Sequence, residues 1–133
     1  MHRSGTIRTQ WCHGAPGVVA SAAALPRDPA LDALLLEGGE LTWEAGPLRK
    51  GAGLCHGTAG NGFALLKLFT RTGDELWLER ARRFAAHAAV QVEADRRRHG
   101  RGRHTLWTGD LGVAIFLRQC LAGASELPAI ELW

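Results

Sequence analysis

Residues 50–60 read KGAGLCHGTAG, a stretch that sets a thiol and an imidazole side by side between glycines. Neighbouring side chains on an α-helix diverge by about 100°, so Cys55 and His56 could not easily share a metal ion from within a helix. They could share one from a turn made by Gly53 and Gly57, because glycine permits positive φ. The apolar run that follows predicts a helix, and its N-terminal dipole would favour the thiolate form of Cys55.

A second stretch of this kind, WCHGAPG, occupies residues 11–17 and carries Cys12. Together, Cys12, Cys55 and His56 offer enough soft ligands for one zinc ion. Two alternatives stay open on the residues alone: buried structural thiols beside a helix-capping histidine, or a redox-active pair of Cys12 and Cys55. The chain has three cysteines, and this odd count argues against a disulfide framework. We therefore expect a reducing compartment, the cytoplasm.

The Gly-x-x-Gly pairs that begin at Gly14, Gly57 and Gly109 form an internal repeat, with intervals of 43 and 52 residues. Each interval holds one predicted helix after the glycine pair and a second before the next pair. This arrangement is typical of an array of helical hairpins, which bury their apolar faces against their neighbours. We therefore predict an all-α fold of about two and a half hairpin repeats.

Apolar spacing, glycines and prolines predict where the helices lie. We expect helices over residues 18–25, 28–44, 58–72 and 74–92, and a last one from the third glycine pair to Gly123. Asp28, Thr58 and Asp74 are predicted to cap three of them. The buried face of the second helix is expected to carry Leu31, Leu34, Leu35 and Leu41. Residues 93–104 are expected to form a charged, solvated connection.

The composition is that of an ordinary globular protein, with 46% hydrophobic and 22% charged residues. A formal charge of +3 is too small to indicate a nucleic-acid-binding protein. The basic run at 96–103 also lacks the interleaved aromatic residues that stack on bases. No apolar run reaches the roughly 18 residues of a membrane span. We expect neither nucleic acid nor a membrane span.

Taken in order, WCHGAPG at residues 11–17 and KGAGLCHGTAGN at residues 50–61 resemble the C-terminal part of the LanC-like proteins, which comprise the lanthionine synthetase C family and its eukaryotic relatives. The resemblance extends from about residue 8 to residue 132. It implies an α/α toroid of seven helical hairpins, of which this sequence resembles the last two to three. We therefore expect residues 1–133 to form the C-terminal part of such a toroid.

The resemblance also implies a metal site and a reaction. Cys12, Cys55 and His56 match the family's zinc ligands, and a substrate thiol would occupy the fourth position. The implied reaction adds the thiol of glutathione or of a peptide cysteine to dehydroalanine or dehydrobutyrine, and it forms a thioether. The expected partners are a dehydrated peptide or protein and glutathione.

Three further residues take roles from the resemblance. Arg8 matches an arginine that would stabilise the developing enolate, His13 matches a residue that lines the site and would donate a proton, and Lys50 matches a lysine associated with glutathione. The family's catalytic histidine and aspartate lie in upstream hairpins that have no counterpart in this sequence. The alternatives are a non-catalytic helical module that binds zinc and glutathione, and a purely structural helical array.

Overall fold

The computed structural model describes residues 8–127, and over this range it contains five α-helices and no β-strand. The helices are α1 (Ala15–Ala22), α2 (Pro29–Ala45), α3 (Thr58–Thr72), α4 (Glu75–His99) and α5 (Asp110–Ala122). The prediction of an all-α fold is confirmed here, whereas the number of hairpin repeats stays a prediction. Within the same range, no helix combines the length and apolar character needed to cross a bilayer.

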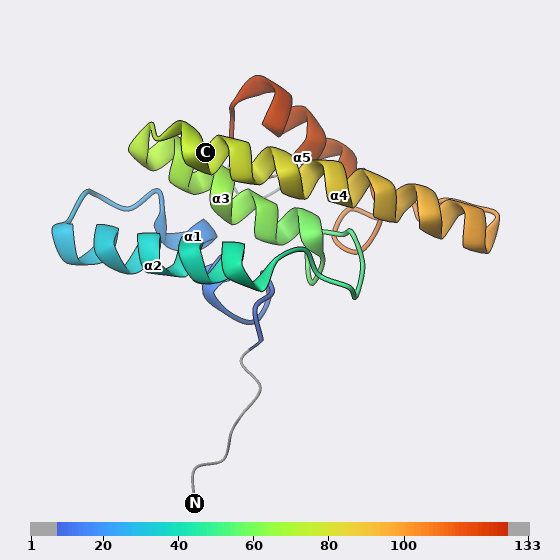
Figure 1. Ribbon diagram of the computed structural model, residues 1–133, viewed down its shortest axis with the longest axis horizontal. Helices are drawn as coiled ribbons and strands as arrows, with labels where there is room; N and C mark the ends of the chain where they lie inside the picture. Colours follow the sequence, from blue (N-terminus) through green and yellow to red (C-terminus); the bar gives the residue numbers. More distant parts are fainter. Residues whose placement is uncertain (1–7, 128–133) are drawn as a thin grey trace, which may run out of the picture.

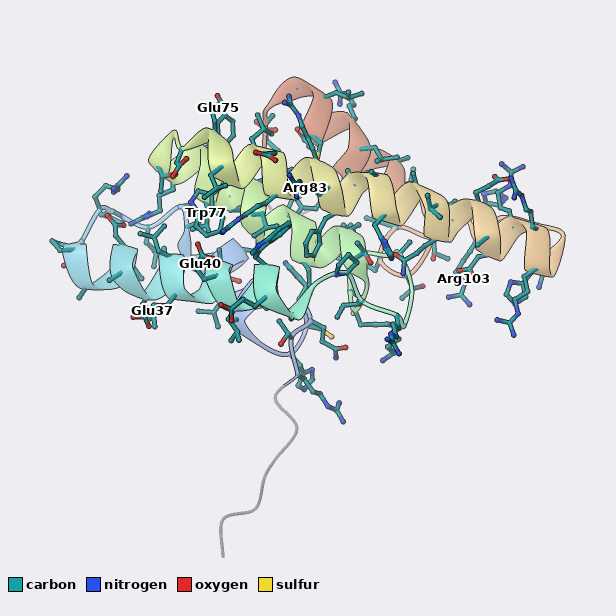
Figure 2. The ribbon with its side chains drawn as sticks, viewed as in Figure 1. Glu37, Glu40, Glu75, Trp77, Arg83 and Arg103 are labelled. Atoms are coloured by element: carbon teal, nitrogen blue, oxygen red, sulfur yellow. The ribbon has the colours of Figure 1, made fainter. Side chains whose placement is uncertain are left out.

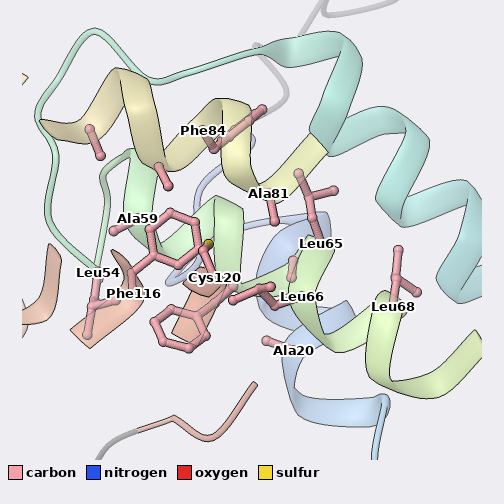
Figure 3. Close-up of a cluster of buried hydrophobic side chains, with 14 of the residues drawn as sticks. Ala20, Leu54, Ala59, Leu65, Leu66, Leu68, Ala81, Phe84, Phe116 and Cys120 are labelled. Atoms are coloured by element: carbon pink, nitrogen blue, oxygen red, sulfur yellow. The ribbon is translucent and has the colours of Figure 1, made fainter. Parts of the chain in front are cut away.

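Helix α3 is the centre of the molecule and contacts each of the other four helices (Figure 1). Every residue from Thr58 to Leu68 is buried, and all of them except Thr58, Asn61 and Lys67 are glycine or apolar, as expected for a helix packed on all its faces. Gly62 lets α5 approach closely, because a Cβ there would lie 2.1 Å from the ring of Phe116. Figure 3 shows Phe116 in this core with Phe84 from α4.

Polar side chains hold the starts of α2 and α4 and the α1–α2 connection in place. Asp28 accepts a hydrogen bond from Leu31 N, and Asp74 accepts one from Leu76 N, so two of the three predicted N-caps are confirmed. Arg71 at the end of α3 has a side chain that is only 4% exposed, and it pairs with Asp32 of α2 at 2.6 Å. It also donates to the backbone carbonyls of Ala23, Leu25 and Pro26 in the α1–α2 connection.

Three expectations about the helix ends are wrong. Residues 93–99 belong to α4 and not to a connection, because this charged segment has good helix formers and an i,i+4 pair between Arg97 and Glu93 at 3.0 Å. The left-handed Gly100 then ends the helix. Thr58 is the first residue of α3 and not its cap, which is Gly57. Helix α1 also starts and ends three residues before its predicted bounds.

The buried face of α2 also differs from the prediction. Leu34 and Leu41 are 55% and 40% exposed, whereas Leu35 is fully buried. Gly39 shares the buried face with Leu35 and allows two helices to approach α2. A Cβ at Gly39 would lie 2.2 Å from Leu68 Cδ1 and 2.8 Å from the ring of Trp77. This glycine is therefore a packing contact as well as a local weakness of the helix.

Candidate metal centre

The three Gly-x-x-Gly pairs build the same kind of loop at the start of α1, α3 and α5. The first glycine of each pair is the N-cap of its helix. A Cβ on the second glycine would lie 2.0 Å (Gly17), 1.8 Å (Gly60) or 2.2 Å (Gly112) from the carbonyl oxygen six residues earlier. Each loop therefore folds back against the first turn of its helix, and only glycine leaves the necessary space.

The turn that carries Cys55 and His56 does not depend on positive φ at Gly53 and Gly57, contrary to the expectation. Gly57 has φ −129°, and Gly53 is not among the positive-φ glycines, so left-handed backbone is not what they supply. They supply space instead. A Cβ at Gly57 would lie 2.5 Å from the backbone of Gly53, and one at Gly53 would lie 2.9 Å from the backbone of Thr108.

A short ladder of backbone hydrogen bonds places the three loops side by side. Equivalent positions in the loops carry Cys12, Cys55 and Trp107. Cys12 N donates to Cys55 O at 3.0 Å, and Cys55 N donates to Trp107 O at 2.8 Å. The rings of Trp11 and Trp107 also contact each other, with centroids 5.4 Å apart. The ladder brings the two cysteines together although 43 residues separate them in the sequence.

The loops gather the three expected donor groups into one cluster. One ligand atom each from Cys12, Cys55 and His56 lies within 4.8 Å of the other two. Cys55 and His56 lie in the turn before α3 and not in the helix itself. Ligands around a tetrahedral zinc ion are roughly 3.5–3.8 Å apart at the usual bond lengths, so small side-chain rotations are enough to close the set. Two thiols and an imidazole with this spacing fit zinc.

Electrostatics at Cys55 differ from the expectation based on the helix dipole. Burial raises the pKa of the Cys55 thiol, the neighbouring Cys12 side chain raises it further, and the charge of Lys50 lowers it. Burial and the Cys12 side chain outweigh Lys50, so the pKa of Cys55 is raised. The protein's own groups therefore favour the protonated thiol, and a bound cation would have to displace that proton.

A cavity of about 760 Å³ lies beside the cluster and is lined by His56 and Lys50. Residues 51–53 and Gly57 of the same loop also line it, and the rest of its lining comes from the last turns of α4 and from residues 101–110 around the third glycine loop. The cationic residues there are Lys50, Arg96, Arg101 and Arg103, accompanied by His99 and His104, and the acidic ones are Asp95 and Asp110. Figure 2 labels Arg103 in the segment after α4. This excess of positive charge suits an anionic ligand.

The cavity shows what the sequence interpretation missed. The basic run at 96–103 was expected to be a solvated connection, yet Arg96, Arg101 and Arg103 line one cavity together with Lys50. The basic run was visible in the sequence, but no local signal indicates that it lies beside the loop of Lys50, some 50 residues earlier. Gln10 was also missed, and its Nε2 lies 3.5 Å from the sulfur of Cys12.

The structure does not bring Arg8 and His13 into the cluster or the cavity lining. Both residues are exposed. His13 is tied to Gln10 by a pair of backbone hydrogen bonds, and the carbonyl of Arg8 packs against Gly14. The catalytic roles expected for Arg8 and His13 stay predictions.

The third cysteine belongs to the core. Cys120 on α5 is 3% exposed, and burial raises the pKa of its thiol to about 12. A thiol in this environment is a packing group and not a ligand or nucleophile.

Comparisons with known proteins agree with this architecture. A family model described as lanthionine synthetase C-like protein matches residues 2–132. A relative from Danio rerio, glutathione S-transferase LANCL1, is 45% identical over 95% of this chain and 32% of its own length. A relative from Arabidopsis thaliana, LanC-like protein GCL1, is 38% identical over 59% of this chain and 19% of its own length. The chain thus spans about a third or less of these relatives, and it belongs to the lanthionine synthetase C-like family.

Proposed function

We propose that this chain carries the zinc site of a thioether-forming enzyme, in which a thiol adds to a dehydroalanine or dehydrobutyrine residue. The observation that carries the proposal is the cluster of Cys12, Cys55 and His56, whose ligand atoms lie within 4.8 Å of one another. Membership of the family and the printed name of the Danio rerio relative support a glutathione-linked role.

The donor set suits a catalytic site better than a structural one. Three protein ligands leave one tetrahedral position for a substrate thiol, and Cys12 lies on the exposed side of the cluster. Zinc, when bound, supplies a positive charge that stabilises an incoming thiol as thiolate at neutral pH. The protein's own task is then to hold the thiol and the dehydrated residue in line.

The cationic cavity suits glutathione as the thiol donor. Glutathione carries two carboxylates, and Lys50, Arg101 and Arg103 offer three positive groups beside His56. Charge-assisted hydrogen bonds from these groups would orient the tripeptide with its thiol towards the cluster. We propose a dehydrated peptide or protein as the second substrate, and the cytoplasm as the compartment, because the cysteine ligands must stay reduced.

A non-catalytic module that binds zinc and glutathione is the second candidate. It is favoured by the positions of Arg8 and His13, which are exposed and lie outside both the cluster and the cavity lining. Turnover would then require a proton donor for the enolate from another part of the α/α toroid, of which we propose this chain to be the C-terminal part, and this chain alone would only bind.

Metal analysis combined with an activity assay tests the proposal. The purified chain should bind one zinc per molecule. Cys12→Ala and Cys55→Ala should each weaken binding strongly, whereas Cys120→Ala serves as the matched control with a cysteine outside the cluster. A dehydroalanine peptide with glutathione should give the thioether, detected by mass spectrometry, and Lys50→Ala should raise the KM for glutathione.

The results separate the candidates. Zinc and glutathione binding without product would leave the non-catalytic module. Zinc stoichiometry that is the same in Cys12→Ala, Cys55→Ala and Cys120→Ala would overturn the metal centre itself.

A further inference from the structure

Asn61 is a polar side chain in a place where the repeat otherwise carries an apolar one. It directly follows Gly60, and the residues that follow the equivalent glycines Gly17 and Gly112 are Val18 and Val113. Val113 is buried, as is Asn61, whose exposed fraction is 0%. The loop-to-helix geometry of this repeat therefore accommodates valine, and the amide of Asn61 needs another explanation.

Only one of the two polar atoms of the Asn61 amide forms a hydrogen bond. The Nδ2 atom of Asn61 donates to Thr9 O at 2.9 Å. The Oδ1 atom is buried and has no hydrogen-bond partner among residues 8–127. A buried acceptor without a partner lowers stability, so the amide is a costly choice for packing alone. Residues that lower stability without a packing benefit are typical of functional sites.

The hydrogen bond joins the two halves of the metal centre. Thr9 lies three residues before Cys12, whereas Asn61 lies in the first turn of α3, six residues after Cys55. The backbone bond from Cys12 N to Cys55 O holds the other end of segment 9–12. With both ends attached, the segment has little freedom to swing the exposed Cys12 away from the cluster.

We propose that Asn61 is a positioning residue of the metal centre, which fixes segment 9–12 so that the Cys12 sulfur meets Cys55 and His56. The inference rests on the proposed zinc site. Asn61 does not touch the metal in this arrangement; it acts through Thr9 and so determines whether the first cysteine is available as a ligand. Groups that orient metal ligands typically change metal affinity by 10–100-fold when they are removed.

Cobalt substitution tests this role, because the thiolate-to-cobalt charge-transfer band reports how many cysteines bind the ion. Asn61→Val introduces the residue that the repeat uses elsewhere, and Asn61→Asp keeps the shape but removes the donor. Both variants should bind zinc about tenfold more weakly than the parent. Their cobalt band should fall towards that of Cys12→Ala. Thr42→Val, which removes another buried hydrogen bond remote from the loops, is the matched control and should keep the parent spectrum.

Stability measured in the presence of a chelator distinguishes positioning from packing. Asn61→Val should unfold at the same or a higher urea concentration than the parent, because it removes the unpaired Oδ1. Variants with the parent's zinc affinity and cobalt spectrum would overturn the inference while leaving the zinc site intact. A loss of stability with an unchanged spectrum would also overturn it, since Asn61 would then be merely structural. A parent chain that binds no metal would instead refute the proposed function.

Discussion

Replacing Gly60 by alanine should disrupt the fold and the metal centre together. Gly60 is a helical residue, so alanine by itself would favour the helix by about 1 kcal/mol. The new Cβ, however, would lie 1.8 Å from the carbonyl oxygen of Leu54 and 2.9 Å from its carbonyl carbon. Leu54 directly precedes Cys55, so the loop that presents two of the three donors would have to move.

The magnitude follows from what the Cβ would meet. Overpacking a dense core costs about 1–3 kcal/mol, and the upper part of this range applies because a backbone carbonyl cannot rotate away. Subtracting the gain in helix propensity leaves a net loss of about 2 kcal/mol in the free energy of unfolding. Displacement of the Cys55 loop should also weaken zinc binding by about tenfold or more.

Urea unfolding followed by circular dichroism, with a chelator present, measures the first effect, and zinc competition with a chromophoric chelator measures the second. Gly38→Ala is the matched control. Its Cβ would meet the side chains of Val19 at 2.8 Å and Ala15 at 3.8 Å, the nearest backbone atom outside α2 would be 4.0 Å away, and the site is on another helix. The control should keep the parent's zinc affinity. A Gly60→Ala variant that is as stable as the parent and binds zinc equally well would refute the packing of this loop against α3.

Two other variants test the core and its connections. Phe116→Ala should lower the free energy of unfolding by about 3–5 kcal/mol in urea titrations, because the ring is fully buried and its centroid lies 5.3 Å from that of Phe63. Phe116→Leu is the control and should lose clearly less stability. An equal loss in the two variants would contradict this packing. Burial opposes ionisation of Asp32, yet hydrogen bonds and charge from Arg71 and Arg27 lower its pKa. A folded-state pKa below the unfolded value stabilises the protein at neutral pH, and this contribution is lost as the pH falls below about 4. In Asp32→Asn, the free energy of unfolding from urea titrations should depend less on pH between pH 3 and 7. An unchanged pH dependence would show that other carboxylates cause it.

The sequence predicted what local chemistry determines. Apolar spacing and the caps Asp28 and Asp74 predicted most of the helical residues, since these signals act within one or two turns. The adjacent Cys55 and His56 between glycines indicated a turn with metal-binding groups for the same reason. The prediction for the end of α4 is wrong because it relied on the charge of residues 93–99 as the sign of a connection, although helix propensity continues to the left-handed Gly100.

The chain by itself therefore specified its helices and the identity of its donor groups. Only the tertiary structure decided which loops meet: Cys12 reaches Cys55 through a backbone ladder, Gly39 allows α2 to contact Trp77, and the arginines after α4 line one cavity with Lys50. These contacts join residues tens of positions apart. They depend on how whole helices pack around α3, and a period of 3.6 residues carries no information about that.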